Sequence, residues 1–225
     1  MNSSRLPGKA LLPIKNNKSL IEIIIERAKK INGIDHICVA TSKKESDDIL
    51  VSKMNELGVS IFRGSLNDVL NRALEASTKF SYSSFLRICG DRPLFDPNIY
   101  SQLVNIHKQN KNDLTTNIFP RTVPAGLSGE VINFKVLRKI AKRISTSIEK
   151  EHITKHIYEN HKNYLIQNVN QKSDVIPIKY KLTLDDKFDY EKITWIYNNL
   201  DNNEIYDLNK IMALNIKWTK NKNKI

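Results

Sequence analysis

The chain has 225 residues, of which 40% are hydrophobic and 27% charged, a balance that is ordinary for a globular protein of one sizeable domain or two small ones. Its net charge of +12 comes from 36 lysine and arginine residues against 24 aspartate and glutamate residues, and would suit nucleic acid, an anionic membrane surface or a small polyanionic substrate. No apolar stretch is long enough to cross a membrane and no signal peptide opens the chain, which favours the cytoplasm. The two cysteines form no C-x-x-C pair, which argues against a zinc site and a disulfide framework.

Helices and strands alternate in the first half. Ser19 and Glu22 form a capping box, and apolar residues at helical spacing after it predict a helix over 20–31. Short apolar runs predict doubly covered strands, and capped or periodic segments predict the helices between them. In chain order we expect a strand at 36–41, a helix opened by Asp47 and Asp48 and stopped by Gly58, a strand at 59–62, a helix at 68–76, a strand at 85–89 and a helix at 98–107.

This alternation predicts an α/β fold with a mainly parallel, Rossmann-like sheet flanked by helices. Ligands of such sheets bind outside the carboxyl ends of the strands. The loops at 41–42, 63–65 and 90–91 are therefore the first candidates for a site.

The second half changes character, although no linker divides it from the first. We interpret residues 113–180 as an elaboration of a single domain spanning 1–216, and the basic tail 217–225 as disordered. The expected elements are strands at 114–118 and 130–134 around a Pro/Gly-rich loop at 120–129, a polar helix at 148–158, strands at 164–168 and 178–184, and helices at 189–200 and 204–212.

The N-terminal stretch Ser3-Ser4-Arg5-Leu6-Pro7-Gly8-Lys9 gathers two hydroxyls, a guanidinium, a glycine and an ammonium within seven residues. Such a loop could cradle an anion, or it could be a solvated basic terminus. Partners elsewhere in the chain have to decide between the two interpretations.

Two aspartates follow predicted strands. Asp91 comes after the run 85–89 in a Gly-Asp-x-Pro segment that is also good turn chemistry, and Asp185 ends the run 178–184 close to helix-capping aspartates. Two strand-end carboxylates that converge on a basic loop are what is needed to hold Mg²⁺ against a triphosphate. The segment Arg63-Gly64-Ser65 could read a nucleobase edge or cap the next helix.

Four segments in a fixed order carry a family resemblance: 3–9, 62–70, 87–94 and 182–185. In this combination the sequence resembles the cytidylyltransferases of the spore-coat polysaccharide protein F type, relatives of the synthetases that make CMP-Kdo and CMP-sialic acid. The resemblance extends to about residue 200. It implies a nucleotidyltransferase fold of the glycosyltransferase-A type, Mg²⁺ as cofactor and CTP as donor.

The resemblance also implies roles for individual residues. Arg5 and Lys9 match the family's triphosphate-binding arginine and lysine, and are the expected catalytic groups. Asp91 and Asp185 match its metal-binding aspartates. The remaining expected contacts are Ser3, Ser4, Arg63, Gly64 and Ser65 with the nucleotide, and Glu130, Glu151 and His152 with the acceptor.

The implied reaction is Mg²⁺-dependent transfer of a cytidylyl group from CTP to an acidic sugar or sugar phosphate, for surface polysaccharide biosynthesis. The alternatives are a sugar transferase of glycosyltransferase-A type, for which Asp91 and Asp96 are spaced too far apart, and a truncated, inactive nucleotide-binding relative. A nucleic-acid-binding module ranks lowest, because no basic face interleaved with aromatics is present. Residues 164–180 are a candidate dimer arm, as in related synthetases.

Three departures from the family pattern stand out. Relatives place a buried strand directly before the Ser-Ser-Arg loop, so we expect either a start upstream of Met1 or a shortened chain whose sheet has unpaired backbone groups. Arg92 stands where many relatives have a small residue. Ser128 replaces an acidic residue, which leaves the acceptor open.

Overall fold

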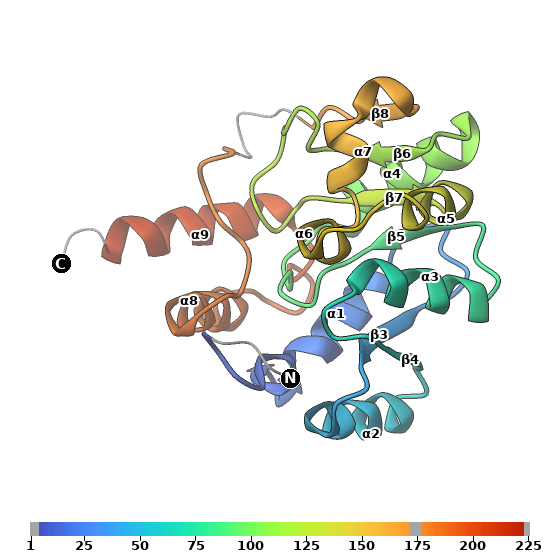
Figure 1. Ribbon diagram of the computed structural model, residues 1–225. Coiled ribbons are helices and arrows are strands. Elements are labelled where there is room, and N and C mark those ends of the chain that lie inside the picture. The colour runs from blue at the N-terminus through green and yellow to red at the C-terminus, as the bar shows by residue number, and fades with distance from the viewer. Residues whose placement is uncertain (1–4, 172–176, 223–225) are drawn as a thin grey trace.

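A computed structural model describes residues 5–171 and 177–222, and Figure 1 shows their arrangement. The helices are α1 (Leu20–Ala28), α2 (Asp48–Glu56), α3 (Val69–Lys79), α4 (Pro97–Asn110), α5 (Phe134–Ala141), α6 (Ser147–Glu151), α7 (Lys155–Glu159), α8 (Lys187–Asn198) and α9 (Leu208–Lys222). The strands are β1 (Pro13–Lys15), β2 (Lys18–Ser19), β3 (Cys38–Ser42), β4 (Ser60–Gly64), β5 (Ser84–Arg87), β6 (Leu114–Thr116), β7 (Glu130–Asn133) and β8 (Ile166–Asn168).

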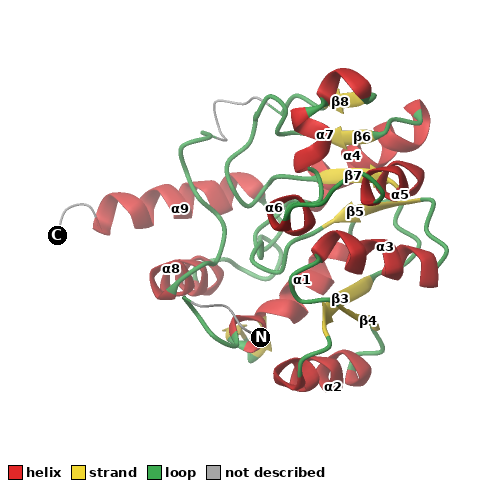
Figure 2. Cartoon of the chain, viewed as in Figure 1, coloured by secondary structure: helices red, strands yellow, loops and turns green. Residues whose placement is uncertain are grey.

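Helices cover sheets whose strands run mostly one way, which confirms the predicted α/β class (Figure 2). Strands β3 and β4 pair in parallel. The larger sheet has the order β5-β7-β6-β8, in which β7 is antiparallel to both neighbours and β8 is parallel to β6. Strands β5, β6 and β8 therefore share a direction, and β7 alone opposes it.

The two sheets do not join. Among the described residues β3 pairs only with β4, and β5 pairs only with β7, so each has one unpaired edge. The strands expected at 36–41 and 85–89 exist, but the prediction that they are doubly covered is wrong: none of Cys38, Val39 or Ala40 is buried, and Ala40 is exposed. The expectation of unpaired backbone groups in the sheet is confirmed.

The main core lies between α1, α4, α8 and α9 and the loops that cross them. Arg27, only 2% exposed, donates from Nε to the Phe95 carbonyl at 2.7 Å and from Nη1 to the Ile205 carbonyl at 2.5 Å. Buried leucines at 94, 182 and 184 belong to the same cluster. The chain segments after β5 and before α8 are thus anchored in the core, and both carry candidate site residues.

Polar caps begin the helices where the sequence predicts them. The backbone N–H of Ser19 donates to Glu22 Oε2 at 2.9 Å, as a capping box requires. Asp68 caps α3 by accepting from Asn71 N at 2.8 Å, and Asp96 caps α4 ahead of a proline at the first helical position.

Several predictions for the second half are wrong. Residues 178–184 form no strand: 178–179 lie in a turn, and among the described residues the segment makes one isolated bridge, between Ala125 and Lys181. The helix expected at 148–158 is broken after His152 into α6 and α7. Helix α5 and the β1–β2 hairpin were not expected.

The tail prediction is also wrong as far as Lys222, because α9 continues to that residue. The Trp218 ring packs against Trp195 at 5.4 Å and Phe188 at 6.3 Å between centroids, so apolar contact with α8 orders this segment. Residues 223–225 lie outside the described chain. The candidate dimer arm at 164–180 includes β8 and reaches into the residues not described, and the dimer stays a prediction. No described helix has both the length and the hydropathy for crossing a membrane.

Candidate functional site

The structure brings the segments of Asp91 and Asp185 together at the carboxyl end of β5. The backbone N–H of Leu184 donates to the carbonyl oxygen of Asp91 at 2.8 Å. Lys9 joins them from the N-terminal loop, since its Nζ donates to the Leu184 carbonyl at 2.8 Å. The three segments predicted from the sequence therefore meet, although Lys9, Asp91 and Asp185 are each more than 80 residues apart along the chain.

Cations surround the Asp185 carboxylate. Lys181 Nζ lies 2.9 Å from Oδ2, while Arg5 Nη2 and Lys9 Nζ lie 3.6 and 3.8 Å from Oδ1. Burial raises the pKa of Asp185, but hydrogen bonds from Lys181 and Thr183, with the charges of Lys181 and Lys9, lower it overall. The carboxylate is consequently ionised at neutral pH.

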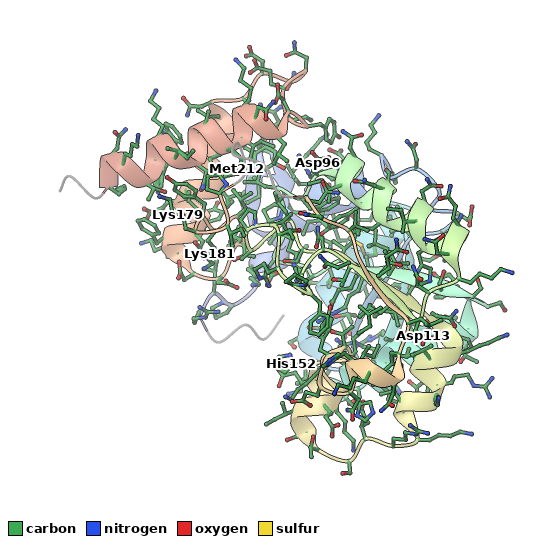
Figure 3. All side chains as sticks on the ribbon, turned by 90° about the horizontal axis from the view of Figure 1, so that it is seen from above. Asp96, Asp113, His152, Lys179, Lys181 and Met212 are labelled. Carbon is green, nitrogen blue, oxygen red and sulfur yellow. The ribbon has the colours of Figure 1, made fainter. Side chains whose placement is uncertain are left out.

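Lys181 was not a sequence-predicted site residue. Its ammonium is shared between Asp185 and Asp189, with 2.5 Å to Asp189 Oδ2, and Figure 3 shows it beside α8. Asp189 also accepts from the backbone N–H of Asp185 at 3.0 Å and pairs with Lys192 at 3.3 Å. This network fixes the segment that carries Asp185. The spacing of four residues between Lys181 and Asp185 could have indicated this ion pair, but the sequence analysis predicted a strand there, in which the two side chains would not meet.

The N-terminal loop presents its charges at this carboxylate. Gly8 adopts a left-handed conformation, with φ of 71°, and caps the short 3-10 helix Lys9–Leu11. The Arg5 side chain is 64% exposed, so its guanidinium can reach a ligand as well as Asp185. Ser3 and Ser4 lie outside the described residues.

Asp91 carries an unusual oxygen. Among the residues that the structure describes, its buried Oδ1 has no hydrogen-bond partner, and Arg92 Nε lies 3.9 Å from it. A buried carboxylate oxygen without a donor is unfavourable unless a ligand completes it. Arg92 itself donates to the carbonyl oxygen of Ser128, which also accepts from Tyr100 Oη at 2.7 Å, so the two departures from the family pattern contact each other.

These carboxylates suit Mg²⁺. The ion takes hard oxygen ligands, and in nucleotide sites it needs only one or two carboxylates beside water and phosphate. Within residues 5–171 and 177–222 no group of three or more His, Cys, Asp or Glu side chains gathers as a metal site. A metal at this place would therefore depend on the substrate for several of its ligands.

The segment expected at the nucleobase lies on the smaller sheet. Arg63 donates from Nε to the Ser42 carbonyl at 3.2 Å and from Nη2 to the Lys44 carbonyl at 2.9 Å, and pairs with Asp48 at 2.7 Å. The arginine thus fixes the loop after β3. Ser65 Oγ accepts from the backbone N–H of Asp68 at 3.0 Å. Asp68 is itself the cap of α3, so Ser65 holds the turn before the helix and does not cap it.

Gly64 lies at the end of β4, where a Cβ atom would stand 2.7 Å from Arg72 Cγ. Packing alone therefore requires glycine at this position, independently of any role in binding a nucleotide. The role of Arg63, Gly64 and Ser65 in nucleotide binding stays a prediction.

The acceptor candidates occupy two places. Glu130, 4% exposed, pairs with Arg87 Nη1 at 3.3 Å and accepts from Tyr158 Oη at 2.7 Å. Burial, and then the charge of Glu130, raises the pKa of Tyr158. Glu151 and His152, at the end of α6, line the cavity beside β5 (Figure 3 labels His152). Nothing in the sequence marked Arg87 or Tyr158 as partners of Glu130.

Comparison with known proteins gives a consistent result. A family model described as cytidylyltransferase matches residues 1–212. The spore coat polysaccharide biosynthesis protein SpsF of Bacillus subtilis is 32% identical over 202 residues, which are 88% of this chain and 82% of that protein. An 8-amino-3,8-dideoxy-manno-octulosonate cytidylyltransferase of Shewanella is 31% identical over 112 residues, 48% of this chain and 44% of that enzyme.

Solved structures are similar as well. A cytidylyltransferase from Leptospira borgpetersenii superposes with a TM-score of 0.86 at 30% identity, over 96% of this chain and 91% of that one. A CMP:2-keto-3-deoxy-manno-octonic acid synthetase complexed with CTP gives a TM-score of 0.65 at 16% identity, over 88% and 94%. The second likeness is one of fold alone, and with the first it confirms the predicted nucleotidyltransferase fold.

Proposed function

The chain belongs to the cytidylyltransferase family, and we propose that it transfers the cytidylyl group of CTP to an acidic sugar or sugar phosphate, with release of pyrophosphate. The observation that carries the proposal is the meeting of Arg5, Lys9 and Lys181 around Asp185, in a segment that bonds the Asp91 backbone carbonyl through Leu184. The relative from Shewanella is named for a sugar acid, and the relative from Bacillus subtilis for a surface polysaccharide.

The reaction asks for positioning and charge neutralisation. An acceptor oxygen attacks the α-phosphorus of CTP, a new P–O bond forms, and the bond to the bridging oxygen of the β-phosphate breaks. The electron pair leaves with pyrophosphate. Arg5 and Lys9 would offset the negative charge that builds on the α-phosphate and on pyrophosphate. Glu130, Glu151 and His152 are proposed contacts of the acceptor.

Asp91 and Asp185 would hold Mg²⁺. The buried, unpartnered Oδ1 of Asp91 and the ionised Asp185 fit a hard divalent cation. Bound there, the ion would neutralise phosphate charge. The hydrogen bond and charge of Lys181 lower the pKa of Asp185, and the bond from Leu184 N to the Asp91 carbonyl holds the two segments together.

The test replaces each of the two proposed metal-binding aspartates by asparagine, and compares them with the same change at the neighbouring Asp186. We expect Asp185→Asn and Asp91→Asn each to lower turnover by at least about a hundredfold while the fold is retained. Asp186→Asn is the matched control: Asp186 caps α8 by accepting from Asp189 N at 2.9 Å, its only side-chain hydrogen bond within the described residues, and asparagine caps a helix equally well. Mg²⁺-dependent pyrophosphate release near the wild-type rate in Asp91→Asn would sink the assignment.

Two other functions were considered from the sequence. A sugar transferase would need a D-x-D pair of carboxylates at the end of one strand, and Asp96, the candidate partner of Asp91, is instead buried and caps α4. An inactive nucleotide-binding relative is the second candidate, and the gap between β3 and β5 is the observation that favours it.

A further inference from the structure

Helix α5 and the turn that closes it carry a row of cations. The basic residues recur three, four, seven and eight positions after the first, so they lie on one face of the helix. All five are exposed, and we call them the basic stripe: Lys135, Arg138, Lys139, Lys142 and Arg143. The opposite face of α5 is buried in a core cluster through Leu137 and Ile140.

No carboxylate balances the basic stripe. Residues 134–143 contain no aspartate or glutamate, and within the part of the chain that the structure describes none of the five cations forms a salt bridge. The Arg138 guanidinium lies over the Phe134 ring, 5.9 Å from its centroid. The next carboxylate along the chain, that of Glu149, accepts from Thr146 Oγ1 at 2.7 Å and pairs with His156 at 3.1 Å. The charge of the stripe is therefore open to a partner.

This arrangement is unfavourable for the helix itself. Like charges three or four positions apart on a helix repel each other, and Lys139 has three such neighbours, at 135, 142 and 143. Lys135 also lies in the first turn of α5, where the helix dipole disfavours a cation. An anionic partner would remove this repulsion.

The shape of the basic stripe points to an extended partner. Its cations form a row on the outward face of a helix, and none of them lines the cavity of about 680 Å³ beside β5. Small ligands bind in concave sites where several polar groups converge. A row of charges on a helix surface instead matches an anionic surface.

We propose that the basic stripe docks the protein onto the surface of an anionic phospholipid bilayer. Clusters of about four to eight lysine and arginine residues on an amphipathic helix are attracted by anionic lipid headgroups. The neighbouring helix α6 adds an apolar contact, because Ile148 is 56% exposed and both α5 and α6 pack on α3. An exposed isoleucine beside cations suits the boundary between headgroups and acyl chains. Single-stranded nucleic acid would require exposed aromatic rings for base stacking, and the stripe contains none.

Docking through α5 leaves the candidate site open. Strands β5 and β7 are antiparallel, with Ser84 opposite Asn133, so α5 begins at the amino end of β5, whereas Asp91 follows the carboxyl end. Figure 1 shows α5 and α8, the helix after Asp185, on opposite sides of the molecule. A bilayer at the basic stripe would therefore not cover Asp91 or Asp185.

Vesicle sedimentation at physiological salt tests the proposal. The full chain is mixed with vesicles of phosphatidylcholine alone, or of phosphatidylcholine with phosphatidylglycerol. The stripe variant combines Arg138→Gln, Lys139→Gln and Lys142→Gln. The control variant changes three exposed lysines of α9 to glutamine, and α9 also contains no acid, so the same charge is removed from a helix of the same kind: Lys217, Lys220 and Lys222.

We expect the wild type to bind the mixed vesicles at least about tenfold more tightly than those of phosphatidylcholine alone, and the stripe variant to lose at least about tenfold in affinity. The control variant should bind within about twofold of the wild type, because distant charges are screened. Ile148→Ser should weaken binding at least about twofold. The stripe variant should melt no lower than the wild type, since repulsion is relieved and glutamine favours helices about as well as lysine.

Three results would overturn the proposal. The first is equal binding to both kinds of vesicle. The second is an equal loss in the stripe and control variants, because net charge would then act without a docking face. The third is binding of duplex DNA or RNA through the basic stripe without binding of mixed vesicles, which would make nucleic acid the partner. These readouts are independent of the proposed enzymatic activity.

Discussion

Gly126 supports the segment that carries Asp185. Its φ is +107°, and a Cβ atom there would lie 2.7 Å from Leu182 Cβ and 2.8 Å from the Leu182 carbonyl carbon. The neighbouring Ala125 carbonyl accepts from Leu182 N at 2.8 Å, so loop and segment are joined at this point. Leu182 precedes Asp185 by three residues. Gly126→Ala should therefore disturb both stability and the site.

The magnitude follows from two effects. An L-residue at such a φ costs about 1–3 kcal/mol. Forcing a methyl group against backbone that belongs to the core costs about another 1–3 kcal/mol. Gly58→Ala is the matched control, since its φ is +62° but no atom lies within 4 Å of the Cβ position, and only the conformational cost of about 1–2 kcal/mol remains.

Urea unfolding of the two variants measures the first part, and pyrophosphate release from CTP measures the second. We expect Gly126→Ala to lose more stability than Gly58→Ala and to lower kcat/KM about a hundredfold, because small displacements of site groups have effects of that size. Gly58→Ala should keep the wild-type kcat/KM. Equal stability losses together with equal activities would refute the described packing of the loop on 181–185.

Two further predictions concern the core and the site. Arg27→Met keeps the apolar stem of the side chain but removes charged hydrogen bonds to two carbonyl oxygens. The free energy of unfolding, measured in urea, should fall by about 3–5 kcal/mol. A loss below about 1 kcal/mol would contradict the buried contacts of Arg27. Lys181→Met should raise the pKa of Asp185, which is held below its usual range in the wild type, so the acid limb of the kcat/KM profile should move to higher pH. The stability that ionised Asp185 provides above its ordinary pKa, and that is lost as pH falls, should shrink in the same variant, and an unmoved acid limb would argue against the Lys181 pairing.

The first half of the fold could be predicted because its signals are local. Capping residues such as Ser19, Asp68 and Asp96 mark where helices begin, and short apolar runs mark strands. Asp91 and Asp185 could be chosen because carboxyl ends of strands gather ligands, although the second follows a segment that forms no strand.

What could not be predicted depends on distant partners. Residues 178–184 alternate like a strand, but their neighbours are the loop at Ala125 and the Asp91 carbonyl. Lys181 becomes a site residue only through this path. Likewise, Arg63 contacts Ser42 at the end of β3, Lys44 in the loop after it and Asp48 at the start of α2, and no sequence motif indicates these contacts.

Burial of β3 and β5 was overestimated for a related reason. An apolar run such as 36–41 is typical of a strand that is paired on both edges and covered on both faces. Among the described residues, β3 pairs with β4 alone, and its first three residues are not buried.

Pyrophosphate release tests the central claim most directly. CTP, UTP, GTP and ATP are each supplied with Mg²⁺ and a panel of acidic sugars and sugar phosphates, using the 225-residue chain and its Asp185→Asn variant. The proposed function predicts release that requires CTP and an anionic acceptor and that falls at least about a hundredfold in Asp185→Asn. Release that is independent of the acceptor, equal for all four nucleotides or unchanged in Asp185→Asn would contradict it.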